Sequence, residues 1–142
     1  MRSIKQLLEG RSFPVSVAPG DTVLSALKKM AEMEIGALLV LEDGKLVGIF
    51  SERDYARKVV LKGKASNDTP IREVMSEKIV YVTPEKSVEE CMALMTDRRC
   101  RHLPVLGPAQ EVLGILSIGD LVKETISEQK FIIEQLERYI TQ

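Results

Sequence analysis

Hydrophobic and polar residues along the chain follow two periods, which predict short strands separated by amphipathic helices. In the first half, apolar residues recur at helical intervals over 23–33, and unbroken apolar runs of strand length occupy 37–41 and 46–50. The pair Asp43-Gly44 lies between these two runs, and Asp-Gly in that position is a strong β-hairpin signal. The first half is therefore predicted to hold a small sheet with a helix beside it.

The second half repeats this order of elements. The first half begins with a short extended piece at 14–17 and ends with a helix from Ser51 to about Lys62, before a polar linker at 63–68. The same succession of strand, helix, strand, strand and helix is predicted at residues 79–82, 88–98, 103–106, 112–116 and from Ser117 onward. A half of this size leaves one face of its sheet uncovered. We therefore expect the two β-α-β-β-α halves to pack face to face as one α/β (α+β) module with pseudo-twofold symmetry.

Both ends of the chain are predicted to be helical. Residues 1–10 form a short lead-in helix that ends at Gly10. The tail over 127–142 has apolar residues at helical intervals, namely Phe131, Ile132, Leu136, Tyr139 and Ile140. This spacing predicts an amphipathic C-terminal helix, with an apolar face that packs on the module or on a second subunit.

One seven-residue motif occurs twice, each time where an apolar run gives way to a predicted helix. Residues 48–54 and 114–120 both read Gly-Ile-x-Ser-x-x-Asp. The match extends upstream, where Val17 and Val82 each begin a Val-x-Pro-x-x-x-Val segment ahead of a helix. An internal repeat of this kind decides the architecture, so the chain is interpreted as a tandem duplication.

Composition narrows the function classes. The chain has 142 residues, 44% of them hydrophobic and 29% charged, as in an ordinary globular protein. Its net charge of −1 gives no general field to hold nucleic acid or an acidic membrane. No apolar run approaches the roughly 20 residues that cross a bilayer, and the start lacks the apolar stretch of a signal peptide. We therefore expect a cytoplasmic protein that binds neither nucleic acid nor membrane.

The supply of catalytic and metal-binding side chains is small. The two cysteines, Cys91 and Cys100, form neither a disulfide framework nor a zinc-ligand spacing, and Cys100 is interpreted as a buried, inert thiol. No paired carboxylates, metal cluster or nucleophile–base set is apparent. We expect no catalytic residues, no metal site and no enzyme activity.

The residue types of the motif suit nucleotide binding, but the spacing has a second interpretation. Glycine lets a ligand approach the backbone, a helix N-terminus attracts phosphate, and a carboxylate on the first turn can accept both hydrogens of a ribose diol. Ser-x-x-Asp is also close to a capping box, in which the acid bonds the cap's own N–H. Ser87-x-x-Glu90 has comparable spacing at a place where we expect no ligand. Spacing alone leaves both interpretations open.

The duplicated motif, the order of elements and the Val-x-Pro-x-x-x-Val segments together resemble the cystathionine-β-synthase (CBS) domain pair, or Bateman module. The run Arg101-His102-Leu103-Pro104-Val105 is similar to a characteristic strand of that family. The resemblance places one CBS repeat at 12–64, a second at 77–126 and a C-terminal helix at 127–142. In detail the chain looks like the small CBS-pair proteins that carry no attached enzyme or transporter.

This resemblance implies that adenosyl ligands bind in two clefts between the halves. The ligands of the family are AMP, ADP, ATP, NAD and S-adenosylmethionine, and no catalytic cofactor is implied. The motif aspartate would hold the ribose hydroxyls, while the motif serine and the helix start would lie near ribose and phosphate. One cleft would be formed by Asp120, Ser117, Gly119, Val15, Gly36 and Ala37. The other would be formed by Asp54, Ser51, Arg53, Val80, Arg101 and His102.

The resemblance favours a nucleotide site over simple capping. Only the first motif has an arginine at its third variable position, Arg53, with Arg57 and Lys58 one turn further on, so that site would hold more phosphate. Arg101 and His102 are expected to point into the same cleft.

The predicted function is a regulatory sensor, not an enzyme. It would bind AMP, ADP, ATP or NAD(H), change conformation, and signal in trans to an unidentified regulated protein, as in energy sensing. A homodimer is expected through the helices at 23–33 and 88–98 and those following Ser51 and Ser117. The alternative is a ligand-free dimeric scaffold for protein interactions, in which the Ser-x-x-Asp pairs are only caps.

Overall fold

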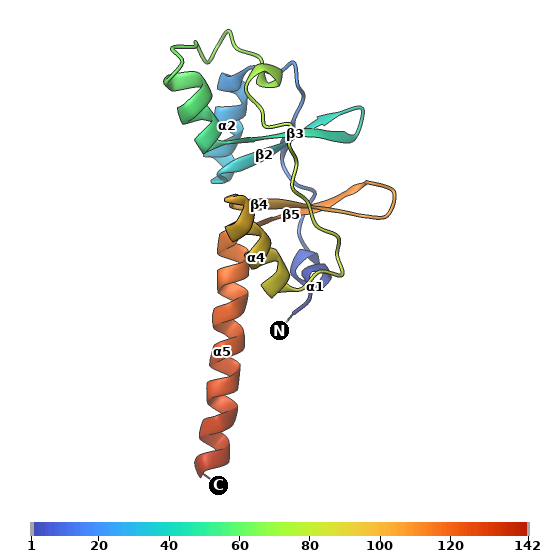
Figure 1. The fold of residues 1–142 in the computed structure, drawn as a ribbon, viewed down its shortest axis with the longest axis vertical. Helices are drawn as coiled ribbons and strands as arrows, with labels where there is room; N and C mark the ends of the chain where they lie inside the picture. The colour runs from blue at the N-terminus through green and yellow to red at the C-terminus, as the bar shows by residue number, and fades with distance from the viewer. Residues whose placement is uncertain (1, 142) are drawn as a thin grey trace. The chain divides into compact units, whose positions relative to one another are not determined.

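The structure is a computed structural model that describes residues 2–141, so positions 1 and 142 of the two predicted terminal helices lie outside it. The chain divides into two compact units. The Asp54 unit comprises Ser12–Val80 with Ala109–Val112, and the Asp120 unit comprises the chain up to Arg11, Tyr81–Pro108 and everything from Leu113 onward. Each unit carries one copy of the motif and has its own sheet (Figure 1).

The Asp54 unit has the predicted three-stranded sheet. Its elements are β1 (Ser16–Val17), α2 (Val23–Met33), β2 (Ala37–Glu42), β3 (Lys45–Ser51), α3 (Glu52–Asp54), the π-helix Tyr55–Val60 and a 3₁₀ turn at Ile71–Glu73. Strand β1 runs parallel to β2, and β2 runs antiparallel to β3. Asp43 and Gly44 both have positive φ, 52° and 78°, as a two-residue type I′ turn requires. The predicted hairpin is therefore confirmed.

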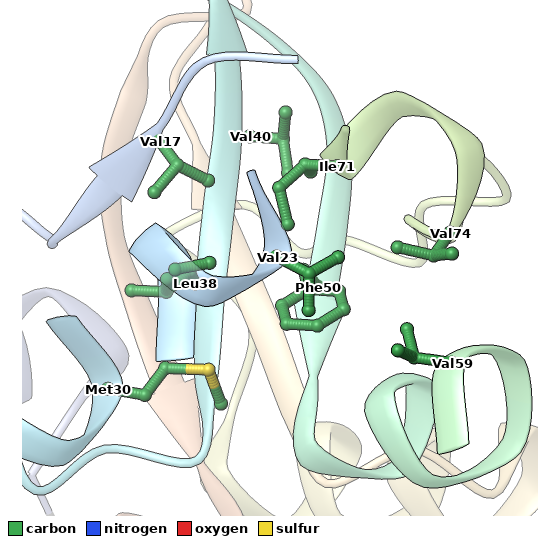
Figure 2. Packing of buried hydrophobic residues seen from close by; sticks show 10 residues of the cluster. Val17, Val23, Met30, Leu38, Val40, Phe50, Val59, Ile71 and Val74 are labelled. Carbon is green, nitrogen blue, oxygen red and sulfur yellow. The ribbon is translucent and has the colours of Figure 1, made fainter. Parts of the chain in front are cut away.

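The core of this unit lies between the sheet and its helices. Figure 2 shows Val23 and Met30 of α2 beside Leu38 of β2 and Phe50 of β3. The run predicted to be buried on both faces is confirmed, because four consecutive residues from Ala37 onward are at most 5% exposed. This burial anchors β2 and β3, and β3 ends at the first motif.

The helix after Ser51 differs from the prediction. The expected α-helix to about Lys62 is a single α turn followed by a π-helix over Tyr55–Val60. In it the N–H of Leu61 bonds the carbonyl of Ala56, five residues earlier, at 3.1 Å. The hydrophobic period predicted a helix here but not its wider turn. Val59 of the π-helix is buried, whereas Leu61, which follows it, is exposed.

The Asp120 unit is built around a two-stranded sheet. Its elements are α1 (Ile4–Leu8), α4 (Val88–Arg98), β4 (His102–Leu106), β5 (Val112–Ser117) and α5 (Ile118–Thr141). The strand predicted at 79–82 is reduced to one parallel bridge between Val82 and Val105. The next bond of this parallel ladder toward 79–81 would have to be donated by Pro104 of β4, which has no N–H, and this is a physical reason for its short length.

Helix α1 belongs to the Asp120 unit. The predicted lead-in helix is confirmed as Ile4–Leu8, and Ser3 and Gln6 form a capping box at its start. Ile4 and Leu7 are buried, and the Leu8 side chain lies against Gly114 of β5. The N-terminal segment therefore packs on the unit that carries the second motif, which no sequence pattern indicated.

Helix α5 is continuous through the position where we expected the second repeat to end. Residues 118–126 and the predicted tail helix form one 24-residue element, Ile118–Thr141. Leu121 and Glu124 on its first turns are buried. Within residues 2–141, none of the helices combines the length and the apolar character needed to cross a membrane.

Candidate functional site

The first motif forms a capping box at the start of α3. Ser51 is the last residue of β3, and its Oγ accepts the N–H of Asp54 at 3.2 Å. In return, Asp54 Oδ2 accepts the N–H of Ser51 at 3.0 Å. The capping interpretation of Ser-x-x-Asp is thus observed directly, and any ligand role is additional to it.

The second oxygen of Asp54 has partners that capping does not require. Its Oδ1 accepts the Ser76 hydroxyl at 3.1 Å and lies 3.3 Å from Lys58 Nζ. The Asp54 side chain is only 11% exposed, whereas the Lys58 side chain is 42% exposed. A ribose diol would need this carboxylate, so it would have to displace Ser76 and Lys58 from it.

The second motif repeats the capping box at the start of α5. Ser117 ends β5, its Oγ accepts the N–H of Asp120 at 3.2 Å, and Asp120 Oδ2 accepts the N–H of Ser117 at 2.8 Å. The carboxylate of Asp120 is therefore fixed at the end of the strand, as that of Asp54 is.

Asp120 also forms an ion pair with Arg11. Arg11 Nη2 lies 3.0 Å from Oδ1, and Nη1 donates to Oδ2 at 3.2 Å and to the carbonyl of Ile115 at 3.3 Å. Partial burial would raise the pKa of Asp120, but the Ser117 hydrogen bonds and the Arg11 guanidinium outweigh it and hold that pKa below its usual range. Asp120 is thus an ionised acceptor near neutral pH.

Each motif aspartate is therefore paired with a cation, which the sequence pattern did not predict. Lys58 is one helical turn after Asp54 and was considered only as a phosphate contact. Arg11 is 109 residues from Asp120, and Ser76 is 22 residues from Asp54. The sequence carries no local signal for the Arg11 and Ser76 contacts, since periodicity and motif spacing do not report long-range pairing.

The motif glycines make room for protein, not for a ligand. A Cβ on Gly48 would lie 2.6 Å from Met75 Sδ, and one on Gly114 would lie 2.7 Å from Leu8 Cδ2. Both distances are too short for real contacts. The glycine at this position is thus explained by close packing of a side chain against β3 or β5, which corrects our expectation of ligand approach.

The first N–H of each motif helix is already used. Glu52 donates its N–H to the carbonyl of Gly36 at 3.1 Å, and Ile118 donates its N–H to the carbonyl of Arg101 at 2.9 Å. Gly36 and Arg101 therefore lie beside the motif of their own unit. Fewer N–H groups are left for a phosphate than a bare helix N-terminus would offer.

The remaining predicted site residues are spread over both units. In the Asp54 unit, Val15 and Val80 are half-buried, Arg53 is exposed, and Ala37 is buried as the residue paired with Ser51 across the sheet. In the Asp120 unit, Gly119 and Arg101 are exposed and His102 is half-buried at the start of β4. Because the predicted clefts draw residues from both units, their assembly stays a prediction.

Two open hollows within single units do not fit a nucleotide. One of about 330 Å³ beside α2 is lined by Leu27, Met30, Gly36 and neighbouring residues, with the carboxylates of Glu34 and Glu52. The other, of about 470 Å³, is lined by Arg2, Gln6, Glu124, Ser127 and Glu128. Carboxylates dominate the charge of both, so neither suits a phosphate.

The two thiols and the possible metal ligands all lie among residues 2–141. Burial raises the pKa of both Cys91 and Cys100, which keeps the thiols protonated near neutral pH. Cys91 is buried, whereas Cys100, which we expected to be buried, is half-buried. Among those residues there is also no group of three or more His, Cys, Asp and Glu side chains able to hold a metal ion.

Comparison with known proteins gives the family. The CBS domain model matches residues 5–61 and 71–127. The mitochondrial CBS domain-containing protein CBSX3 of Arabidopsis thaliana is 41% identical over 125 residues, which cover 84% of this chain and 60% of that protein. This chain thus spans 60% of the length of that relative.

Solved structures agree with this match. A CBS-domain protein from Burkholderia ambifaria is 46% identical, with a TM-score of 0.85 over 90% of this chain and 96% of that one. The CBS domain pair of protein MJ0100, solved with 5′-methylthioadenosine and S-adenosyl-L-methionine, is 22% identical with a TM-score of 0.80 over 90% of this chain and 98% of that one. At 22% identity, the similarity to the MJ0100 pair shows a shared fold and nothing further. With two matched repeats and two copies of the motif, the chain belongs to the CBS domain family as a tandem CBS pair.

Proposed function

We propose that this CBS pair is a regulatory module that binds an adenine nucleotide, AMP, ADP, ATP or NAD(H), through its motif aspartates. The fold of MJ0100 accommodates two adenosyl compounds. The support within this chain is the pairing of each motif aspartate with a cation, Arg11 or Lys58, in addition to its capping bonds. Capping alone needs no such cation.

The ion pairs suggest how a phosphorylated ligand would be preferred. The two hydroxyls of a ribose would donate to the Asp120 carboxylate in place of Arg11. The freed guanidinium would then lack its counter-charge, and the phosphate of a nucleotide would supply one. A nucleoside offers the hydroxyls but no phosphate, so it would leave Arg11 unpaired. The proposed site therefore discriminates AMP from adenosine.

The two sites are proposed to differ in strength. The Asp120 side chain is 25% exposed and is paired with Arg11, whereas the Asp54 side chain is 11% exposed and is bonded by Ser76 as well as paired with Lys58. Ligand access should therefore be easier at Asp120. The Asp54 site, with Arg53 nearby in sequence, remains the candidate for ligands with more phosphate.

Ligand binding at Asp120 would loosen the N-terminal segment, which gives the conformational change. Arg2 donates to both carboxylate oxygens of Glu124, at 2.8 and 2.9 Å, and Arg11 binds Asp120 one turn earlier on α5. Two ion pairs thus tie the segment that contains α1 to α5. If the ligand breaks the Arg11–Asp120 ion pair, the segment that contains α1 is held to α5 less strongly. The equilibrium then shifts toward a state in which this segment has left α5, by as much as the ligand binds that state more tightly.

The module would act in trans, on a protein not yet identified, and without catalysis of its own. A cytoplasmic location and a homodimer through the helices after each first strand and each motif remain predictions of the sequence.

The test is calorimetric titration with AMP, ADP, ATP, NAD, NADH and S-adenosylmethionine. It should be repeated on Asp120→Asn, Asp54→Asn and Glu90→Gln. Glu90 is a matched control, since it forms a capping box with Ser87 but has no expected ligand role. We expect one ligand to bind and Asp120→Asn to weaken it at least tenfold, while Glu90→Gln leaves it unchanged.

If the natural sequence binds none of the six ligands, the ligand-free scaffold is favoured. One observation supports that alternative: among residues 2–141, no buried side-chain nitrogen or oxygen lacks a hydrogen-bond partner. A site already satisfied internally can persist without a ligand. In that case the aspartate variants would lower stability and change no affinity.

A further inference from the structure

The distal half of α5 has no packing partner among the described residues of its unit. Every residue over 129–141 is exposed, including Ile133 at 54%, Leu136 at 56% and Ile140 at 79%. Figure 1 shows this part of the helix extending past α1 and α4 of the same unit. An unsupported helix of roughly 12–15 residues is only marginally stable in water. A helical segment with this many exposed apolar residues indicates that another surface covers it.

The apolar residues form a regular seam. Ile126, Ile133 and Ile140 recur every seven residues, and Val122, Gln129 and Leu136 each precede one of them by four. This alternation of four and three is the heptad pattern of a coiled coil, with isoleucine at position a and, apart from Gln129, aliphatic residues at position d. We call these six residues the α5 seam.

The α5 seam is separate from the face with which α5 packs on its own unit. Leu121 and Glu124 are buried on that face. Val122 and Ile126, which begin the seam, are 40% and 49% exposed. The seam therefore remains open along the whole helix, including the part next to the rest of the unit.

We propose that the distal α5 seam packs antiparallel against the same seam of a second copy of this chain. The pattern is self-complementary: with Ile133 opposite Leu136 of the second copy, Gln129 falls opposite Ile140, and each pairing occurs twice. Antiparallel helices also place the remainder of the two Asp120 units at opposite ends, where they do not collide. This proposal is independent of any nucleotide.

The charges beside the seam favour the second copy and set the orientation. Lys130 and Glu137 occupy the same heptad position, e. Antiparallel packing sets e positions of two helices side by side, so each Lys130 meets a Glu137 of the second copy. In a parallel pair these residues would face position g, which holds Ile132 and Tyr139. Over 129–141, Lys130 and Arg138 balance Glu134 and Glu137, so two copies do not repel.

The first experiment measures amide hydrogen exchange of 129–141 in the full chain, together with sedimentation equilibrium. Ile133→Asp places a charge in the seam, and Gln135→Asp places the same charge on the polar face two residues later. We expect 129–141 to be protected in the natural sequence and in Gln135→Asp. In Ile133→Asp we expect loss of protection and at least tenfold weaker self-association. Equal exchange of 129–141 in the natural sequence and in Ile133→Asp would overturn the proposal. That result is expected if the partner of this segment is another protein or a membrane.

The second experiment tests the orientation by charge exchange. Lys130→Glu and Glu137→Lys each set like charges side by side in an antiparallel pair, and the double variant restores opposite charges. We expect each single variant to weaken self-association severalfold and the double variant to recover it. If the double variant is no better than the single ones, the antiparallel arrangement is wrong.

Discussion

Arg11 and Asp120 form a two-contact ion pair, at 3.0 and 3.2 Å, that joins the start of the chain to the first turn of α5. The pair places a guanidinium on the carboxylate that a ribose would need. Arg11 is thus both a competitor for Asp120 and, once displaced, a cation available for phosphate. These two roles predict opposite effects of its removal on two related ligands.

We expect Arg11→Ala to raise the affinity for adenosine and to lower the affinity for AMP. Adenosine no longer competes with a guanidinium for Asp120, whereas AMP loses a charge-assisted contact. A contact of this class contributes about 1.5–3 kcal/mol, so the preference for AMP over adenosine should fall by about tenfold or more. Calorimetry with both ligands measures the ratio.

Arg2→Ala is the matched control for that measurement. It removes the Arg2–Glu124 ion pair from the same helix without touching Asp120. The ratio of the two affinities should stay the same in Arg2→Ala. If Arg11→Ala instead lowers the affinities for adenosine and AMP by the same factor, the role of Arg11 is purely structural.

Acid should destabilise the Asp120 unit through its two paired carboxylates. Hydrogen bonds from the Arg2 side chain and backbone lower the pKa of Glu124, and the pKa of Asp120 is also lowered. A carboxyl whose pKa is lower in the folded state contributes stability that is present above its usual pKa of about 4 and lost as pH falls through the folded value. Thermal unfolding from pH 7 to 3 should show this loss.

The double variant Glu124→Gln, Asp120→Asn checks the source of that acid sensitivity. It should be less stable than the natural sequence at pH 7 and should lose less stability between pH 5 and 3. An unchanged pH profile would mean that other carboxyls dominate acid unfolding.

Alanine at either close-packed motif glycine should destabilise the fold. Gly114→Ala forces Leu8 aside, and Gly48→Ala meets Met75 and also the backbone oxygen of Ser76 at 3.2 Å. Overpacking of this kind costs about 1–3 kcal/mol. Because backbone moves less readily than a flexible side chain, Gly48→Ala should be the more damaging change in urea unfolding.

The third motif glycine is the internal comparison. A Cβ at Gly119 would lie an ordinary 3.5 Å from Ser117 Oγ, its one neighbour within 4 Å among residues 2–141 outside the adjoining backbone. Gly119 also lies in the first turn of α5, where alanine is the better helix former. Gly119→Ala should therefore leave the free energy of unfolding unchanged or raise it slightly. Equal losses of unfolding free energy for alanine at all three glycines would contradict the packing explanation.

Glycine at the end of α2 should stabilise the protein. Glu34 is the C-cap of α2 and has a left-handed backbone, with φ of 54° and ψ of 46°. That conformation costs a non-glycine residue about 1 kcal/mol, so Glu34→Gly should raise the free energy of unfolding by up to about that amount. Glu32→Gly, inside the same helix, should lower it by about 1 kcal/mol. Both are measured by denaturant unfolding.

The sequence predicted what local patterns and internal repetition encode. The buried run from Ala37, the Asp43-Gly44 turn and the two strand-to-helix junctions are where the pattern placed them. It did not predict the π-helix after Asp54, because a six-residue segment is too short for hydrophobic spacing to distinguish the wider π turn from an α turn. The strand expected at 79–82 was wrong in extent, since Pro104 of the partner strand has no N–H to continue the pairing before Val82.

The candidate site was predicted less completely than the fold. Motif repetition found Ser51, Asp54, Ser117 and Asp120, and each pair forms the expected local contact. The cation on Asp120 comes from the other end of the chain, and no periodicity links Arg11 to it. The motif glycines were misinterpreted for a similar reason, because Leu8, which contacts Gly114, is also remote in sequence.

The continuity of α5 makes it a mechanical lever. Its 24 residues correspond to a rod of about 36 Å, with Asp120 in the first turn and Ile140 near the last. A tilt of about 5° at the motif end would displace the far end by roughly 3 Å, because the helix has no break along its length. Ångström-scale rearrangements at Asp120 would thus be magnified at a distant surface with no intervening hinge.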